Sequence, residues 1–97
     1  METRVALLAI IVREGAGVET LNQLLHAYSA YIIGRMGVPY RERGVRIISV
    51  AVDAPNAVIS ALSGKIGRLP GITAKTVYAP ADREQSGTEE TGREDAK

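Results

Sequence analysis

Two segments of this chain are apolar on both of the faces that a β-strand would present. Residues 5–12 read VALLAIIV without interruption and lie between Arg4 and Arg13. Residues 45–53 read VRIISVAVD, and their β-branched side chains favour a strand over a helix. A strand with two apolar faces has to be covered on both sides, so we expect both strands at the centre of a sheet. This requirement limits the folds that the chain can adopt.

The remaining elements follow from periodicity and from residues that start helices. Residues 18–31 carry apolar side chains at three- and four-residue steps, which is typical of an amphipathic helix. A second helix follows Pro55, and Asp53 is its expected cap. The expected buried stripe of that helix is Val58, Ile59, Leu62, Ile66 and Leu69. Residues 72–78 predict a last strand, and residues 32–44 predict an edge strand with a glycine-kinked hairpin.

This order of elements predicts the α+β class and the ferredoxin-like βαββαβ arrangement. In that arrangement two helices cover one face of a four-stranded antiparallel sheet. The opposite face then carries the outward side chains of both doubly apolar strands and forms a large exposed apolar patch. We therefore expect this face, or an edge strand, to be buried in a homo-oligomer, either a homodimer or a homotetramer.

The composition of the chain changes near residue 80. Residues 1–79 hold nine Lys and Arg against five Asp and Glu, whereas residues 80–97 hold three against six. The second segment contains no Val, Ile, Leu or aromatic residue, so burial cannot offset its ordering entropy. We predict one folded domain over residues 1–79 and a disordered acidic tail over residues 80–97.

The apolar segments are too short to cross a membrane. The longest uninterrupted run has eight residues, whereas a transmembrane helix needs about 20. The N-terminal residues also lack the small-residue cleavage site of a signal peptide. We therefore expect a cytoplasmic protein without membrane contact.

The chain offers few residues for catalysis. It has no cysteine, and its one histidine, His26, has no metal-ligating partner three or four residues away, so it is expected at the surface. A turn with two glycines, residues 14–17, precedes the first helix. Such a turn can bind an anion through backbone N–H groups, although two glycines without a fixed motif are more typical of a plain turn. We predict a non-enzymatic protein with no catalytic residue, no cofactor and no metal site.

Residues 32–44 read IIGRMGVPYRERG and combine glycine, proline and arginine unusually densely. Glycine and proline shape the backbone and thereby expose the arginines, which suit a small anionic ligand or a subunit contact. Nucleic-acid binding is an alternative, since Tyr40 could stack on a base and Arg46 adds a fourth cation, but this footprint is small. A purely structural role in assembly is another alternative. The candidate ligand-binding or subunit-interface residues are Gly34, Arg35, Met36, Gly37, Pro39, Tyr40, Arg41, Arg43 and Gly44.

Two motifs resemble those of the family of iron-only hydrogenase system regulators. The first motif falls on residues 34–37 and 39–44. The second falls on Leu62, Gly64, Lys65, Gly67, Arg68, Pro70 and Gly71. The resemblance covers residues 4–79 and implies a ferredoxin-like, ACT-like domain similar to the C-terminal domain of nickel-responsive repressors. It also implies a regulatory or ligand-sensing role linked to iron-only hydrogenases.

The chain departs from the nickel-responsive repressors in two respects. No segment resembles their ribbon–helix–helix DNA-binding domain, so direct DNA binding is not expected. The histidine and cysteine ligands that hold nickel in those repressors have no counterpart here, which excludes nickel sensing by that site.

Overall fold

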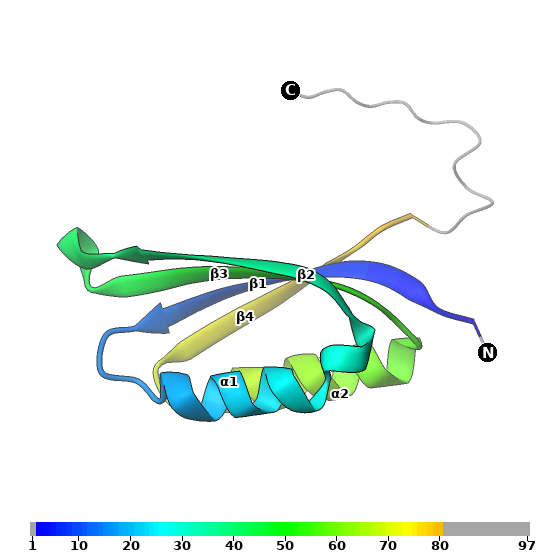
Figure 1. The fold of residues 1–97 in the computed structure, drawn as a ribbon, viewed down its shortest axis with the longest axis horizontal. Coiled ribbons are helices and arrows are strands. Elements are labelled where there is room, and N and C mark those ends of the chain that lie inside the picture. The colour runs from blue at the N-terminus through cyan, green and yellow to red at the C-terminus, as the bar shows by residue number, and fades with distance from the viewer. Residues whose placement is uncertain (1, 81–97) are drawn as a thin grey trace, which may run out of the picture.

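The structure, a computed structural model, describes residues 2–80. Its elements are β1 (Arg4–Arg13), α1 (Val18–Ala27), β2 (Ile32–Tyr40), β3 (Val45–Ala54), α2 (Asn56–Gly67) and β4 (Ile72–Tyr78), with 3-10 turns at Ser29–Tyr31 and Arg41–Arg43. Both helices lie on one side of the sheet (Figure 1). This arrangement confirms the predicted α+β, ferredoxin-like fold. Of the predicted acidic tail, residues 80–97, all but Pro80 lie outside the described residues.

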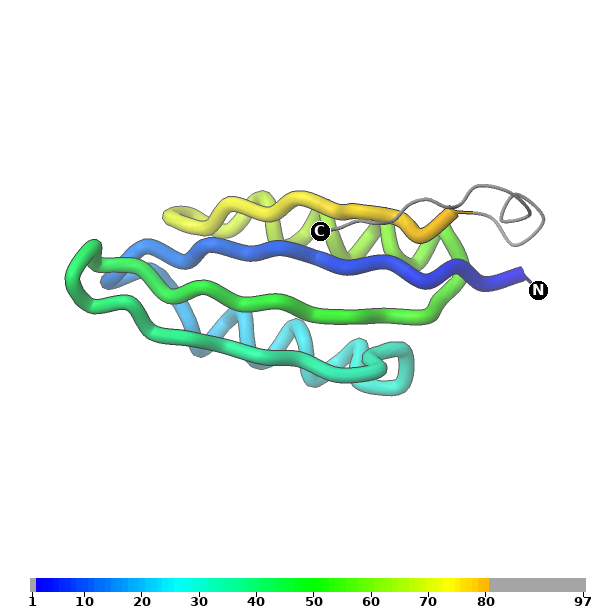
Figure 2. Tube along the Cα trace, turned by 90° about the horizontal axis from the view of Figure 1, so that it is seen from above, coloured from blue at the N-terminus to red at the C-terminus, as the bar shows by residue number. Residues whose placement is uncertain are grey.

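The sheet is antiparallel throughout and has the strand order β2-β3-β1-β4. Figure 2 shows the four strands side by side, with the helices behind them. The two doubly apolar strands, β1 and β3, are the central pair, as predicted. They are in register over their whole length, from Arg4 opposite Ala54 to Arg13 opposite Val45. Their pairing positions every other element.

The core lies between the sheet and the helices. Alternate residues of the two central strands point into it, because successive side chains of a strand face opposite sides. The buried residues are Ala6, Leu8, Ile10 and Val12 of β1, Ile48, Val50, Val52 and Ala54 of β3, Leu21 and Leu25 of α1, Ile59, Leu62 and Ile66 of α2, and Ile72 of β4. Full burial of one Leu or Ile side chain is worth roughly 1.5–3 kcal/mol. Buried apolar side chains from both helices and from three of the four strands therefore hold the helix layer against the sheet.

The first helix is shorter than predicted. It ends at Ala27, and a 3-10 turn continues the chain to Tyr31. The backbone N–H of Tyr28 bonds the carbonyl of Leu25 at 3.1 Å, and the N–H of Tyr31 bonds the carbonyl of Tyr28 at 2.9 Å. Both are three-residue steps, which tighten the helix end into 3-10 geometry. The apolar periodicity does not distinguish this geometry from a last α-helical turn.

The prediction that Asp53 caps the second helix is wrong. Asp53 lies in β3, opposite Val5 of β1, and α2 begins at Asn56 with Pro55 at its cap position and no capping side chain. The pairing of β1 with β3 extends to Ala54 and keeps Asp53 in the strand. The chain therefore enters the helix two residues later than a cap at Asp53 requires.

No helix within residues 2–80 is long and apolar enough to cross a membrane.

Gly71 joins the start of β4 to the turn that follows β1. Its carbonyl accepts a 2.8 Å hydrogen bond from the N–H of Arg13. Its φ is +75°, and a Cβ at this position would lie 2.9 Å from the Cβ of Ala16. Both the left-handed backbone and the close approach require glycine here.

We predict that Gly71→Ala lowers the free energy of unfolding by about 1–3 kcal/mol, because the left-handed conformation alone costs about 1–2 kcal/mol in an L-residue. Gly67→Ala is the matched control. Gly67 ends α2 without a positive φ, and a Cβ there meets no atom within 4 Å, so the change should be neutral or stabilising by up to about 1 kcal/mol. Urea unfolding at one fixed protein concentration measures both effects. Equal effects of the two substitutions would contradict the role assigned to Gly71.

Candidate functional site

The hairpin made by β2 and β3 presents different residues to the two sides of the sheet. Directly opposed residues of an antiparallel pair share a face. Pro39 lies opposite Arg46, and this pair is on the same side as the helices, whereas Tyr40 lies opposite Val45 on the other side. The candidate residues of this hairpin are therefore divided between two surfaces.

The first surface is the side of the sheet that no helix covers, called the open face below. Its exposed large apolar side chains are Val5, Leu7 and Ile11 of β1, Met36, Val38 and Tyr40 of β2, Ile47 of β3, and Val77 of β4. Their exposed fractions run from 41% for Ile11 to 65% for Met36. The predicted apolar patch opposite the helices is thus confirmed.

The apolar residues of the open face lie in rows across the strands. One row consists of Val38, Ile47, Ile11 and Thr73, and another of Gly34, Ala51, Leu7 and Val77. The row between them consists of Met36, Ser49, Ala9 and Lys75. On the two central strands, the residues of that middle row are the small Ser49 and Ala9. A sheet or helix of a second molecule can pack against such a surface.

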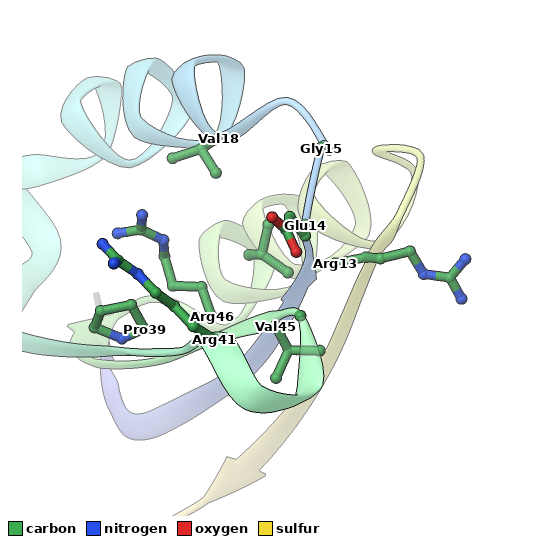
Figure 3. A pocket seen from close by; sticks show the side chains of 10 residues that line it. Arg13, Glu14, Gly15, Val18, Pro39, Arg41, Val45 and Arg46 are labelled. Atoms are coloured by element: carbon green, nitrogen blue, oxygen red, sulfur yellow. The ribbon is translucent and has the colours of Figure 1, made fainter.

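The second surface is a pocket of about 220 Å³ at the end of the sheet where β1 leads into α1. It is lined by Val12, Arg13, Glu14, Gly15, Val18, Pro39, Arg41, Gly44, Val45 and Arg46. One wall is the turn after β1, and the other is the connection from β2 to β3 (Figure 3). The two walls come from segments that are far apart in the sequence.

One backbone hydrogen bond fixes the connection from β2 to β3 against the turn after β1, and a second one shapes the connection itself. The N–H of Glu14 bonds the carbonyl of Gly44 at 2.7 Å, and the N–H of Gly44 bonds the carbonyl of Arg41 at 3.1 Å. Gly44 adopts the left-handed conformation with φ +65°. This conformation turns the chain from the 3-10 turn into β3, and it keeps Arg41 and Arg46 on the two sides of one tight bend.

The charges of the pocket are unevenly distributed. The side chains of Arg41 and Arg46 extend in the same direction beside Pro39, whereas Arg13 points away (Figure 3). Among the side-chain hydrogen bonds formed within residues 2–80, none involves Arg41 or Arg46. The carboxylate of Glu14 lies near the middle of the view. The pocket therefore offers two cationic donors on one side and one anionic acceptor.

The nine predicted site residues do not form one site. Pro39, Arg41 and Gly44 line the pocket. Gly34, Met36 and Tyr40 lie on the open face. Arg35 and Gly37 lie on the helix side of β2, away from the residues that line the pocket. Their role in ligand binding or subunit contact stays a prediction.

Two arginines of the predicted site, Arg35 and Arg43, lie outside the pocket and have different surroundings. Arg35 donates a 3.1 Å hydrogen bond to the side-chain oxygen of Asn22 on α1. Arg43 lies in the exposed 3-10 turn after β2 and is not among the residues that line the pocket. Arg43 therefore provides a matched control for Arg41, because both residues carry the same charge and lie in the same 3-10 turn.

The sequence did not single out Glu14 and Arg46 as members of one site. Only the fold brings the turn after β1 next to the hairpin. The available signals were the glycine turn at residues 14–17 and the position of Arg46 two residues after Gly44. His26 is exposed on α1, as predicted. Within residues 2–80 there is no group of three or more His, Cys, Asp or Glu that could hold a metal ion.

Comparison with known proteins gives a match over nearly all of the described residues. The model of a protein family called TM1266-like, with the description "Iron-only hydrogenase system regulator, putative", matches residues 4–76. The solved structure of the uncharacterized protein TM1266 from Thermotoga maritima matches with 38% sequence identity and a TM-score of 0.79. That match covers 81% of this chain and 100% of the Thermotoga chain. No curated protein matches the sequence.

We predict that Gly44→Ala lowers the free energy of unfolding by about 1 kcal/mol or slightly more, because alanine is strained at a positive φ. A Cβ there would lie 3.2 Å from Oε1 of Glu14, which is the end of a flexible side chain and can move. Gly44→Asn should cost less, because asparagine tolerates the left-handed region better. Urea unfolding of both variants tests this order. The reverse order would show that contact with Glu14, and not backbone strain, decides the effect.

Proposed function

Because this chain belongs to the family of iron-only hydrogenase system regulators, we propose that it is a regulatory protein of such a system and not an enzyme. It works as a homo-oligomer and responds to a small anionic ligand. The open face carries the assembly part of this proposal, because an apolar surface of this extent is unfavourable in water.

The size of the open face suits a protein–protein interface. Four strands at a spacing of about 4.8 Å make it roughly 19 Å wide, and the ten residues of β1 at about 3.3 Å each make it roughly 33 Å long. The flat projection is thus about 600 Å², and the accessible area of a surface with protruding side chains is larger. A specific dimer buries about 800 Å² per partner. The open face can therefore supply one complete dimer interface.

The charges around the open face favour a second copy of the same chain as the occupant. Asp53 lies at one end of this face, opposite Val5, and Arg13 lies at the other end, opposite Val45. A twofold axis across the strands places the Asp53 end of one copy over the Arg13 end of its partner. The apolar side chains of the central strands then meet while opposite charges approach at both ends, which helps to fix the orientation, and Lys75 lies at the edge of the face, on β4.

The ligand-sensing part of the proposal is supported by the pocket at the hairpin. Arg41, Pro39 and Gly44 are among the residues that line it. Arginine pairs with the oxygens of carboxylates and phosphates through its planar guanidinium. The same hairpin carries Val38 and Tyr40 on the open face, so a ligand in the pocket contacts a segment that also contributes to the proposed interface.

We predict that the protein sediments as a dimer or tetramer at micromolar concentration and that Ile47→Lys weakens this association. Ile47 lies on the central strand β3 in the open face and is 42% exposed in one copy. Dimerisation therefore buries less than half of its surface, which is worth about 1 kcal/mol. A symmetric dimer loses two such contacts and buries two lysine charges in their place, so its Kd should rise at least tenfold. Analytical ultracentrifugation over a concentration series measures the change.

Tyr31→Lys is the control for that experiment. Tyr31 is also a large exposed side chain, 36% accessible, but it lies in the 3-10 turn after α1 and not on a strand of the open face. This substitution should leave the dissociation constant within a factor of about three. A wild-type protein that is monomeric at 100 µM would refute the proposed assembly. Equal weakening by both substitutions would place the interface elsewhere.

We also predict that small organic anions raise the melting temperature, whereas divalent metals and uncharged sugars do not. A ligand that binds only the folded state adds about 2.7 kcal/mol of stability at 100 times its Kd. Differential scanning fluorimetry against amino acids, organic acids, sugar phosphates, nucleotides and metals tests this expectation. If none of these raises the melting temperature while the oligomer is intact, the domain has a structural role in assembly only.

A further inference from the structure

The pocket beside the β2–β3 hairpin has a composition that defines a class of ligand. Apart from Arg13 and Val45, its lining residues do not lie on the open face, so the proposed assembly does not account for it. Its two walls are held together by the hydrogen bond from the N–H of Glu14 to the carbonyl of Gly44, and a second bond, from the N–H of Gly44 to the carbonyl of Arg41, shapes the hairpin wall itself. The pocket is thus formed by backbone contacts and does not depend on the position of one flexible side chain.

The cationic side of the pocket consists of Arg41 and Arg46. Arg46 extends from the helix side of β3, opposite Pro39, and Arg41 extends from the 3-10 turn beside it (Figure 3). Within residues 2–80, neither guanidinium takes part in a side-chain hydrogen bond. Two adjacent cations repel each other, and an oxyanion between them removes that repulsion and satisfies several N–H donors. This side of the pocket therefore suits a phosphate or carboxylate group.

The anionic side of the pocket is Glu14. Its backbone is fixed by the 2.7 Å bond to Gly44, and its Oε1 lies 3.2 Å from where a Cβ on Gly44 would be. An ionised carboxylate can only accept hydrogen bonds. A ligand that fills the pocket therefore needs a hydroxyl or another donor at the end away from its oxyanion.

The remaining walls limit the size and polarity of the ligand. Val12, Val18, Pro39 and Val45 contribute apolar contact, which suits a short carbon skeleton. A volume of about 220 Å³ suits a short compound of a few carbon atoms with one oxyanion.

We propose that the pocket between the β1–α1 turn and the β2–β3 hairpin binds a small hydroxylated oxyanion. Arg41 and Arg46 hold its phosphate or carboxylate group, and Glu14 accepts a hydrogen bond from its hydroxyl. The inference rests on the proposed ligand-sensing role and names the site and the ligand class for it. Phosphate esters and hydroxy acids share this chemistry, and the experiment distinguishes between them.

Isothermal titration calorimetry of the full chain with glycerol 3-phosphate, glycerate and inorganic phosphate tests the site. Glycerol 3-phosphate or glycerate should bind more tightly than inorganic phosphate, and the tighter of the two identifies the oxyanion. Arg41→Ala and Arg46→Ala should each weaken that ligand at least tenfold. Arg43→Ala is the matched control, because it removes the same charge from the same turn without touching the pocket, and it should change the Kd less than twofold.

A further variant tests the role of Glu14. Glu14→Ala removes the acceptor for the hydroxyl and also removes a negative charge, so absolute affinities for all anions can rise. The informative quantity is the ratio of the affinity for glycerol 3-phosphate to that for inorganic phosphate. This ratio should fall at least fivefold in Glu14→Ala. An unchanged ratio would overturn the assignment of Glu14.

Several results would overturn the proposed binding site. Sedimentation of the same samples reports the oligomeric state, so failure of the site can be distinguished from failure of the proposed assembly. An oligomer that binds none of the three probes refutes the site and leaves the assembly in place. If Arg43→Ala weakens binding as much as Arg41→Ala does, the anion is attracted by the general positive charge of the turn and does not occupy a defined site. In that case anion sensing stands, and the assignment to this pocket falls.

Discussion

The antiparallel pairing of β1 with β3 is the interaction on which the rest of the structure depends. Ten residues of each strand are paired in register, from Arg4 opposite Ala54 to Arg13 opposite Val45. Because side chains alternate along a strand, this pairing sends half of the apolar residues into the core and the other half onto the open face. The helices can cover only one of these two faces. The exposed apolar surface is thus a direct consequence of the same pairing that builds the core.

The β2–β3 hairpin contributes to two surfaces that its sequence does not separate. Alternate residues of β2, such as Val38 and Tyr40, point to the open face and extend it across the edge strand. Pro39 and Arg46 point to the opposite side of the sheet and form part of the pocket there. A rigid bend at Gly44 connects the two strands. The pocket and the open face are therefore two sides of one hairpin, so the proposed ligand and the proposed assembly would act on the same segment.

The second motif, which falls on residues 62–71, has a different structural role from the first motif in the β2–β3 hairpin. Gly64 and Gly67 lie within α2, whereas Gly71 lies in the bend that follows it. Gly71 approaches Ala16 closely and bonds Arg13 through its carbonyl. This glycine holds the start of β4 against the β1–α1 turn and so supports one wall of the pocket. Gly71 acts here through its backbone, and Leu62 of the same motif packs in the core.

The sequence by itself determined the order of the elements, the central position of the two doubly apolar strands and the apolar character of the face opposite the helices. These features depend on local periodicity and on the burial of apolar side chains, which a single sequence records directly. The place of Asp53 depended on strand pairing between distant segments. The end of α1 depended on local three-residue hydrogen bonds that apolar periodicity does not reveal. At both places the sequence was misleading. Only the tertiary structure decided that Glu14 and Arg46 share a pocket with Arg41, and that Arg35 and Arg43 lie outside it. Glu14 and Arg46, which are 32 positions apart, become neighbours through strand pairing and the backbone bond from Glu14 to Gly44, and no local pattern encodes that contact.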